Sequence, residues 1–263
     1  MIRMIMLLCL VLVAAPWAGA QPRDPEVDVA VVLAVDVSLS MDRDEQRAQR
    51  DGYVAAIRHP AFLSAVARGR LGKVALAYVE WGAPWDQRTI IDWTVIDGPE
   101  TAEAFATRLA EARFSTSRGT SISGAIDHAV ALLERAPPSL RRVLDISGDG
   151  PNNMGEPVLE ARARAMAAGV EINGLPLMIK EFDSMFSIPD LDIYYENCVI
   201  AGPAAFVLPV TRVEQFTAAI RQKLILEVSQ AVPERETMID RSGTDCLVGE
   251  RLYQRWRRSF SFD

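Results

Sequence analysis

Three oxygen-bearing side chains, Asp36, Ser38 and Ser40, alternate with apolar residues on one short stretch of the chain. They directly follow an apolar run, residues 29–35, whose composition is typical of a buried strand. One carboxylate and two hydroxyl groups are ligands that suit a hard cation such as Mg²⁺. This segment therefore predicts one part of a divalent-metal site at the end of a strand.

Two later segments carry the same kind of chemistry. Thr120 lies in the sequence Arg-Gly-Thr-Ser, residues 118–121, which opens an amphipathic helix. Asp149 lies in Asp-Ile-Ser-Gly-Asp-Gly, residues 145–150, which closes an apolar strand over residues 142–146. Each segment adds an oxygen ligand at the start of a helix or the end of a strand.

Together the three segments resemble the metal-ion-dependent adhesion site of von Willebrand factor type A (VWA) domains. The resemblance covers roughly residues 25–230 in the order of elements as well as in the motifs. It implies five metal positions, namely Asp36, Ser38, Ser40, Thr120 and Asp149. The third segment reads Ser-Gly-Asp-Gly where the family more often has Thr-Asp-Gly, so either Asp149 or Asp145 could be the nearer ligand. Asp149 is favoured because it lies beyond the apolar strand, on a glycine-flanked turn.

The resemblance also implies how such a site works. At least one aspartate holds the ion through a bridging water, and a coordination position stays open for a carboxylate of another protein. The expected function is a metal-dependent protein-binding module of the adhesion type, and not an enzyme. Mg²⁺ is the expected ion, while Mn²⁺ and Ca²⁺ accept the same ligands.

Two other functions use the same residues. In a metal-dependent phosphoester hydrolase the ion would polarise a phosphoryl group. The sequence offers little support for it, because Ser38 stands where comparable enzymes carry a second acid, and His59 and His128 are the chain's only histidines. The remaining alternative is an exported structural domain whose ion only stabilises the fold.

Side chains close to the predicted site could contact a partner. Glu80, Trp81 and Trp85 lie at the carboxyl end of the second strand, on the same side as the metal positions. Exposed aromatic residues there would be suitable anchors, although the two tryptophans could equally cover the sheet edge. Asn152 and its neighbour Asn153 could meet the partner, but are better explained as residues that shape the turn.

The elements that position these residues alternate between strands and helices. This order predicts an α/β fold with a doubly wound, mostly parallel, Rossmann-like sheet, and with helices on both faces. The expected strands cover residues 29–35, 73–81, 89–96, 142–146, 170–177 and 204–210. The strand at 89–96 follows a short connection and is expected to be an antiparallel edge. The strands that end at Asp36 and Ile146 should be neighbours at the point where the winding reverses.

Helix signals accompany these strands. Asp42 and Glu45 mark the start of a helix that runs to about Arg58, and Thr211 with Glu214 is expected to form a capping box for a final helix. Apolar residues at helical spacing predict three more helices near residues 102–109, 122–133 and 158–166. Residues 180–203 are expected to be irregular.

The N-terminus has the features of a secretory signal. Residues 1–20 contain Arg3, then an apolar core and a small-residue cleavage site before Gln21. Cleavage there would leave a chain without a membrane span, exported to the periplasm or the outside of the cell. The mature chain would carry 27 basic and 35 acidic residues, a balance that argues against nucleic acid as a partner.

The C-terminal tail, residues 231–263, is expected to pack on the domain. Cys198 and Cys246 are the two cysteines left after cleavage, and an even pair in an exported protein suggests a disulfide that fastens the tail. Arginines alternate with apolar residues in this tail. We expect the apolar side to pack on the domain and the arginines to be solvated, with docking of an acidic partner as the alternative.

Overall fold

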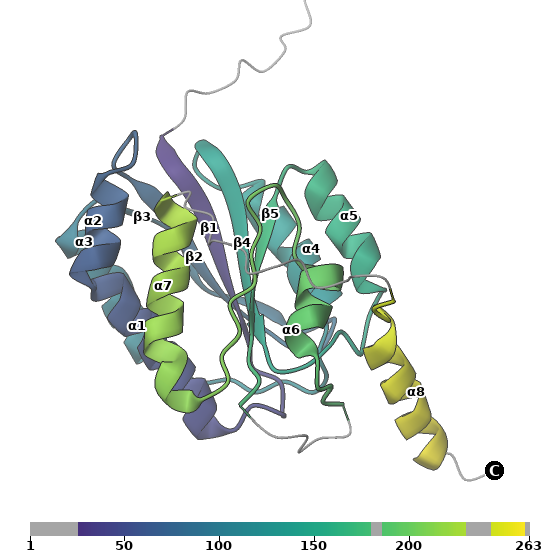
Figure 1. Cartoon of the computed structure of the whole chain (residues 1–263). Coiled ribbons are helices and arrows are strands. Elements are labelled where there is room, and N and C mark those ends of the chain that lie inside the picture. The colour runs from purple at the N-terminus through teal and green to yellow at the C-terminus, as the bar shows by residue number, and fades with distance from the viewer. Residues whose placement is uncertain (1–25, 180–185, 230–242, 261–263) are drawn as a thin grey trace, which may run out of the picture.

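The computed structural model of the chain describes residues 26–179, 186–229 and 243–260 (Figure 1). The predicted signal peptide, residues 1–20, and the first part of the predicted tail, residues 231–242, lie outside the described residues. In the described ranges, no helix is both long enough and apolar enough to cross a membrane.

A five-stranded sheet forms the centre of the fold, with the strand order β3-β2-β1-β4-β5. The strands are β1 (Val27–Asp36), β2 (Val74–Trp81), β3 (Gln87–Ile96), β4 (Ser139–Gly148) and β5 (Glu171–Pro176). All neighbours pair in parallel except β2 and β3, which pair antiparallel. The predicted fold class and its antiparallel edge strand are therefore confirmed.

Strand β1 is central because both of its faces are apolar. Val31 and Leu33 belong to one hydrophobic core and Val32 and Ala34 to the other, so the strand is buried throughout. A continuous apolar run of this kind is typical of a parallel strand covered by helices on both sides. Neighbouring β4 lies in register with it, which brings the carboxyl ends of the two strands together.

Helices cover both faces of the sheet (Figure 1). One face is covered by α1 (Arg43–Arg58), α2 (Pro60–Ala67), α3 (Pro99–Glu111) and α7 (Phe216–Ser229). The other is covered by α4 (Ile122–Leu133), α5 (Val158–Ala167) and α6 (Leu191–Tyr194), which continues as a π-helical turn, Tyr195–Val199. A further helix, α8 (Val248–Phe260), lies in the described part of the tail.

The predicted start of α1 is confirmed by its capping box. The Asp42 carboxylate accepts hydrogen bonds from the backbone N–H groups of Asp44 and Glu45, and the Glu45 carboxylate accepts one from the Asp42 N–H. These bonds satisfy donors that the first turn of a helix leaves without intrahelical partners. The cap residue Asp42 lies two residues after Ser40, so the cap fixes where the first predicted metal segment ends.

Three local predictions are wrong. Residues 204–210 form no strand and contact β5 only by isolated bridges, because Pro209 lacks an N–H and the Phe206 N–H donates to the Asn173 side chain. The region expected to be irregular contains α6 and its π-helical turn. The Thr211 hydroxyl and N–H both donate to Gln215 rather than to Glu214, because a short 3₁₀ turn, Val213–Gln215, precedes α7.

Candidate metal centre

The ends of β1 and β4 bring the first and third predicted segments together. Asp36 is the last residue of β1, and Asp149 directly follows β4. The Ser40 hydroxyl donates to Asp149 Oδ1 at 2.7 Å, and the hydroxyl oxygens of Ser38 and Ser40 are 2.9 Å apart. Four of the five predicted metal positions therefore lie in one small region, although more than a hundred residues separate them in the sequence.

Asp36 is fully buried and only one of its carboxylate oxygens is satisfied. Oδ1 accepts the backbone N–H of Ser38 at 2.7 Å, whereas Oδ2 accepts no hydrogen bond within the described part of the chain. Burial raises the pKa of the Asp36 carboxyl well above its usual value, and the nearby Asp149 charge raises this pKa further. A buried carboxylate in this state is stabilised by a cation.

Gly148 leaves the space that Asp36 occupies. A Cβ atom at this position would lie 2.9 Å from Asp36 Oδ2 and 2.9 Å from the Tyr195 hydroxyl oxygen. Real Cβ atoms do not approach oxygen so closely without displacing it, so any other residue here would move the carboxylate. Tyr195 comes from the π-helical turn after α6, and its hydroxyl oxygen is buried beside the same glycine.

The loop that carries Thr120 is fastened to both other segments. Ser117 pairs with Ser38 in an isolated bridge, and its N–H donates to the Val37 carbonyl at 2.8 Å. On the other side, the Thr120 N–H donates to Asn153 Oδ1 at 3.0 Å, and the Asn153 N–H returns a bond to the Thr120 carbonyl at 2.9 Å. Thr120 is thus held between the β1 end and the turn after β4.

Asn152 shapes the turn after β4 and does not face a partner. Its side chain is completely buried; Oδ1 accepts the Ser123 N–H, and Nδ2 donates to the Glu156 carbonyl and to Glu250 Oε1. Every polar atom of this side chain is thereby engaged inside the protein. The interpretation of Asn152 and Asn153 as turn residues fits these contacts, and Asn152 does not lie on an exposed rim.

Two further rim candidates are also buried. Trp81 has no exposed surface and packs in the core on the α4 side, while Glu80 lies on the opposite face and is paired with Arg50 and hydrogen-bonded to Ser115. Neither can meet a partner, because side chains alternate across a strand and helices cover both faces of β2. Trp85 is different: it lies in the loop after β2 and is 78% exposed.

Asp145 has a different environment from Asp149. It is fully buried on the α7 side of the sheet, and Asp145 Oδ1 lies 2.5 Å from the Lys223 ammonium. Asp149 instead accepts the Ser40 hydroxyl at the strand-end edge. This geometry supports Asp149 as the nearer metal position and Asp145 as part of a buried ion pair.

The donor set at the edge fits a hard divalent cation. It consists of oxygen atoms only, from two carboxylates and three hydroxyl groups. Within the described residues, no group of three or more His, Cys, Asp or Glu side chains could hold a metal ion, so ligation at this edge would need the serine and threonine hydroxyls beside the two carboxylates. The orphaned Asp36 oxygen and the space left by Gly148 agree with this set.

Sequence reasoning missed three residues at this site. The only sequence signal for Gly148 is that it is a glycine at a strand end. Tyr195 lies in a region expected to be irregular. Leu39 lies between the two serines and is 62% exposed. Its position between two candidate ligands, Ser38 and Ser40, is the one sequence signal that could have identified it.

Comparison with solved structures identifies the same architecture in other proteins, each at an identity too low to show more than the fold. The SpaC pilus adhesin of Lactobacillus rhamnosus GG, in an open conformation, matches with a TM-score of 0.57 and 13% identity, over 77% of this chain and 30% of the adhesin. Proximal thread matrix protein 1 of the mussel byssus has a zinc-occupied MIDAS (metal-ion-dependent adhesion site) motif. It matches with a TM-score of 0.55 and 13% identity, over 78% of this chain and 49% of that one.

A third match is the von Willebrand factor domain of the type V pili tip protein Mfa5 from Porphyromonas gingivalis. Its TM-score is 0.53 at 11% identity, and the match covers 81% of this chain and 99% of that domain. The first two proteins are longer, and the chain spans less than half of each. A comparison with curated proteins gives no significant match.

The strand order, the two helical layers and the three converging segments agree with these structural matches. A family model described as protein of unknown function (DUF1194) matches residues 26–232, which is most of the chain. The chain therefore has a von Willebrand factor type A fold and belongs to the DUF1194 family.

Proposed function

We propose that this chain is an exported protein-binding module whose binding depends on a divalent cation held at the ends of β1 and β4. The observation that carries the proposal is Asp36, a fully buried carboxylate whose Oδ2 has no donor among the described residues. Ser38, Ser40 and Asp149 surround the same edge. Burying such a charge is costly unless a cation compensates it.

The residues that would hold the ion are the hydroxyls of Ser38, Ser40 and Thr120 and the carboxylates of Asp36 and Asp149. Mg²⁺ is the proposed ion, with Mn²⁺ or Ca²⁺ as substitutes, because all three prefer oxygen ligands. A bound ion would supply positive charge and a coordination position for an acidic side chain of the partner. The protein itself would hold these ligand oxygens in place at the edge. The Asp42 cap of α1 and the contacts between Thr120 and Asn153 position the segments that carry them.

The exposed side chains beside this edge are proposed to contact the partner. Trp85 is 78% exposed, and its loop contacts the Thr120 loop because the Ser121 N–H donates to the Gly82 carbonyl at 2.8 Å. Leu39 is exposed between the two serines. Tryptophan is among the residues that most often anchor protein interfaces, so Trp85 is the stronger candidate of the two.

Binding is favoured over hydrolysis by the placement of the chain's two histidines. His59 caps α2, where its Nδ1 accepts the Ala61 N–H, and His128 Nε2 is hydrogen-bonded to the Thr89 hydroxyl at 3.0 Å. Neither hydrogen bond joins a histidine to a predicted metal position, so neither marks a general acid or base for a substrate there.

The relatives in fold agree with the proposal. They include a pilus adhesin, a pilus tip protein and a matrix protein whose MIDAS motif holds zinc. We propose a cleaved signal at residues 1–20, a binding domain at 25–230 and a tail at 231–263, with the mature chain in the periplasm or outside the cell. The Cys198–Cys246 disulfide is compatible with an oxidising compartment.

Titration calorimetry with Mg²⁺ tests the metal site. Asp36→Ala and Thr120→Ala should each abolish the binding heat, while the far-UV circular dichroism of both variants stays close to that of the wild type. Asp51→Ala, which removes an exposed carboxylate of α1, is the matched control and should bind Mg²⁺ normally. Unchanged Mg²⁺ affinity in both site variants would show that the assignment is wrong.

The partner can be sought by affinity capture from the native cell envelope. Binding should occur with Mg²⁺ and be lost with a chelator, and the Asp36→Ala chain should capture nothing above background. Capture that survives both chelation and this substitution would speak against a metal-dependent module.

A further inference from the structure

Helix α8 lies outside the segment that the family model matches, which ends at residue 232. In Figure 1 it projects beyond the body of the domain, on the side where the parallel strands end. The predicted metal positions lie at this same edge. The tail therefore adds an element to the functional edge that the family domain alone does not supply.

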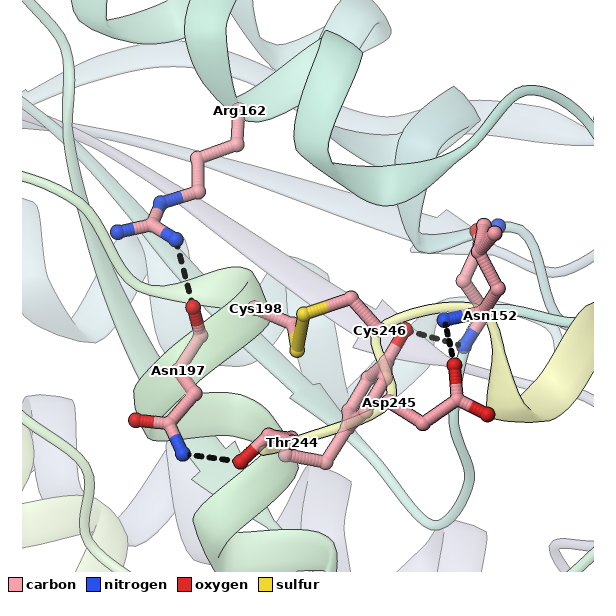
Figure 2. Close-up of a disulfide and its surroundings, with 9 residues drawn as sticks. Asn152, Arg162, Asn197, Cys198, Thr244, Asp245 and Cys246 are labelled. Carbon is pink, nitrogen blue, oxygen red and sulfur yellow. Dashed lines mark hydrogen bonds between the residues drawn. A yellow bond between two sulfur atoms is a disulfide. The ribbon is translucent and has the colours of Figure 1, made fainter. Parts of the chain in front are cut away.

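Two contacts fasten the start of α8 (Figure 2). The Cys198–Cys246 disulfide joins the residues just before the helix to the π-helical turn that carries Tyr195. Asn197 Nδ2 also donates to the Thr244 hydroxyl at 2.5 Å. The disulfide prediction is thereby confirmed, and the helix starts from a fixed point.

The first turn of α8 lies directly on the loop that carries Asp149. Glu250 Oε1 accepts a hydrogen bond from Asn152 Nδ2 at 2.7 Å, and a Cβ on Gly249 would come within 2.1 Å of the Asn152 carbonyl oxygen. Only glycine permits such a close approach of the two backbones. Since Asn152 is three residues from Asp149, the position of α8 is set relative to the metal site.

The apolar side of α8 is already used within the protein. The rings of Tyr253 and Trp256 stack at 5.6 Å between centroids, and both lie against Phe186, at 6.3 and 6.1 Å. Leu252 on the same side is half-buried. These contacts leave the opposite side of the helix to face solvent.

That opposite side is a basic stripe, formed by Arg251, Arg255 and Arg258. Their spacing of four and three residues places them on one face of the helix. Arg251 is 58% exposed and pairs with Asp245, whereas no carboxylate of the described residues pairs with Arg255 or Arg258, which are both exposed. In a chain with a net charge of −7, an exposed row of arginines is a local exception.

We propose that α8 is the second half of the partner-binding surface, and that the partner binds through a protein segment that carries several acidic residues. This inference rests on the proposed function: one carboxylate of the segment would meet the ion, and others would pair with Arg255 and Arg258. The two arginines lie about 8 and 12 Å along the helix from Glu250, within reach of a short extended segment.

A membrane surface is the less suitable occupant of this helix. An interfacial helix inserts its apolar side between lipids. In α8, Tyr253 and Trp256 of that side are packed against Phe186. The free side is charged, which suits electrostatic pairing with carboxylates.

Fluorescence anisotropy with a labelled oligoglutamate peptide tests the proposal on the full mature chain. In excess Mg²⁺ at low ionic strength, the wild type should bind, and Arg255→Gln/Arg258→Gln should bind about five-fold more weakly. The matched control is Arg68→Gln/Arg70→Gln, which removes two exposed arginines beyond the C-terminal end of α2 and should have no effect. Equal affinities of the two double variants would overturn the role of α8.

A parallel calorimetric titration with Mg²⁺ alone separates this proposal from the proposed function. Arg255→Gln/Arg258→Gln should bind Mg²⁺ as the wild type does, because neither arginine belongs to the metal site. If the wild type binds Mg²⁺ normally but does not bind the peptide, the proposal of an acidic partner segment is wrong and the proposed metal site is unaffected. Absence of Mg²⁺ binding in the wild type would instead refute the proposed function.

Two further outcomes would also overturn the proposal. Peptide binding that persists with chelator and in Asp36→Ala would show that the peptide binds independently of the metal site. Co-sedimentation with vesicles of phosphatidylcholine and phosphatidylglycerol that depends on Arg255 and Arg258, without peptide binding, would assign the stripe to a membrane.

Discussion

Asp36 on β1 and Asp145 on β4 are both fully buried on neighbouring strands of the sheet, but they have different electrostatic surroundings. The Lys223 ammonium from α7 lies 2.5 Å from Asp145 and 2.7 Å from Glu227, and the whole group is inaccessible to solvent. Among the described residues, Asp36 has no lysine, arginine or histidine within ion-pair distance, and burial, followed by the nearby Asp149 charge, raises its pKa.

The difference separates a structural ion pair from a candidate ligand. Lys223 is covalently part of the protein, so the Asp145 cluster is complete as soon as α7 packs on the sheet. Asp36 lies at the strand-end edge, where the partly exposed Ser40 and Asp149 connect it to solvent. A buried acid at such an edge can take its cation from solution, and removing or adding that cation changes the charge of the surface.

The largest expected effect comes from removing the lysine of the buried ion-pair cluster. Lys223→Met leaves Asp145 and Glu227 buried without their cation, and should lower the free energy of unfolding by about 3–5 kcal/mol. Lys73→Met, at an exposed lysine, should change it by less than about 0.5 kcal/mol. Urea unfolding measures both, and a loss below about 1 kcal/mol for Lys223→Met would contradict a tightly paired cluster.

The second prediction concerns the pH dependence of the same cluster. Burial and the Asp145 charge raise the pKa of Glu227 from 4.5 to about 7, although Lys223 opposes them. The folded protein therefore binds this proton more tightly than the unfolded chain, so stability present below pH 4.5 is lost as pH rises to about 7. The loss is about 3 kcal/mol.

Glu227→Gln should remove this part of the pH dependence. Urea unfolding of the wild type and of Glu227→Gln between acidic and neutral pH gives the two curves, and their difference isolates Glu227. Parallel curves would mean that Glu227 titrates normally in the folded protein.

The smallest expected effect is that substitutions of Asp36 and Asp145 change the free energy of unfolding in opposite directions. In metal-free buffer, Asp36→Asn should raise the free energy of unfolding by about 1 kcal/mol, because it removes a buried charge that Asp149 repels. Asp145→Asn should lower it, because Lys223 loses a partner. If both substitutions destabilise the chain equally, the two aspartates do not differ in the way described.

Much of the candidate metal centre could be predicted from the sequence because its candidate ligands lie where elements begin and end. The Asp42 capping box and the apolar run of β1 fix the position of Asp36, Ser38 and Ser40 locally. The register of β1 with β4 follows from the parallel topology, which places Asp149 beside them. The one long-range contact that had to be assumed was the pairing of β1 with β4, and the winding of the sheet predicts it.

The rim could not be predicted in the same way. Trp81, Glu80 and Asn152 have the residue types of a contact surface, but burial depends on what packs above each of them. Trp85 and Leu39 lie in loops at the strand ends and are exposed. A sequence pattern gives the face of a strand, and it does not tell which neighbour covers that face.

The sequence by itself determined the fold class, most of the elements and the set of candidate oxygen ligands, since these follow from local periodicity, capping and turn chemistry. Tertiary structure alone decided that Lys223 neutralises Asp145, and that α8 rests on the Asp149 loop. Both contacts join residues far apart in the chain, and electrostatic pairing at such separations depends on packing that no local pattern encodes.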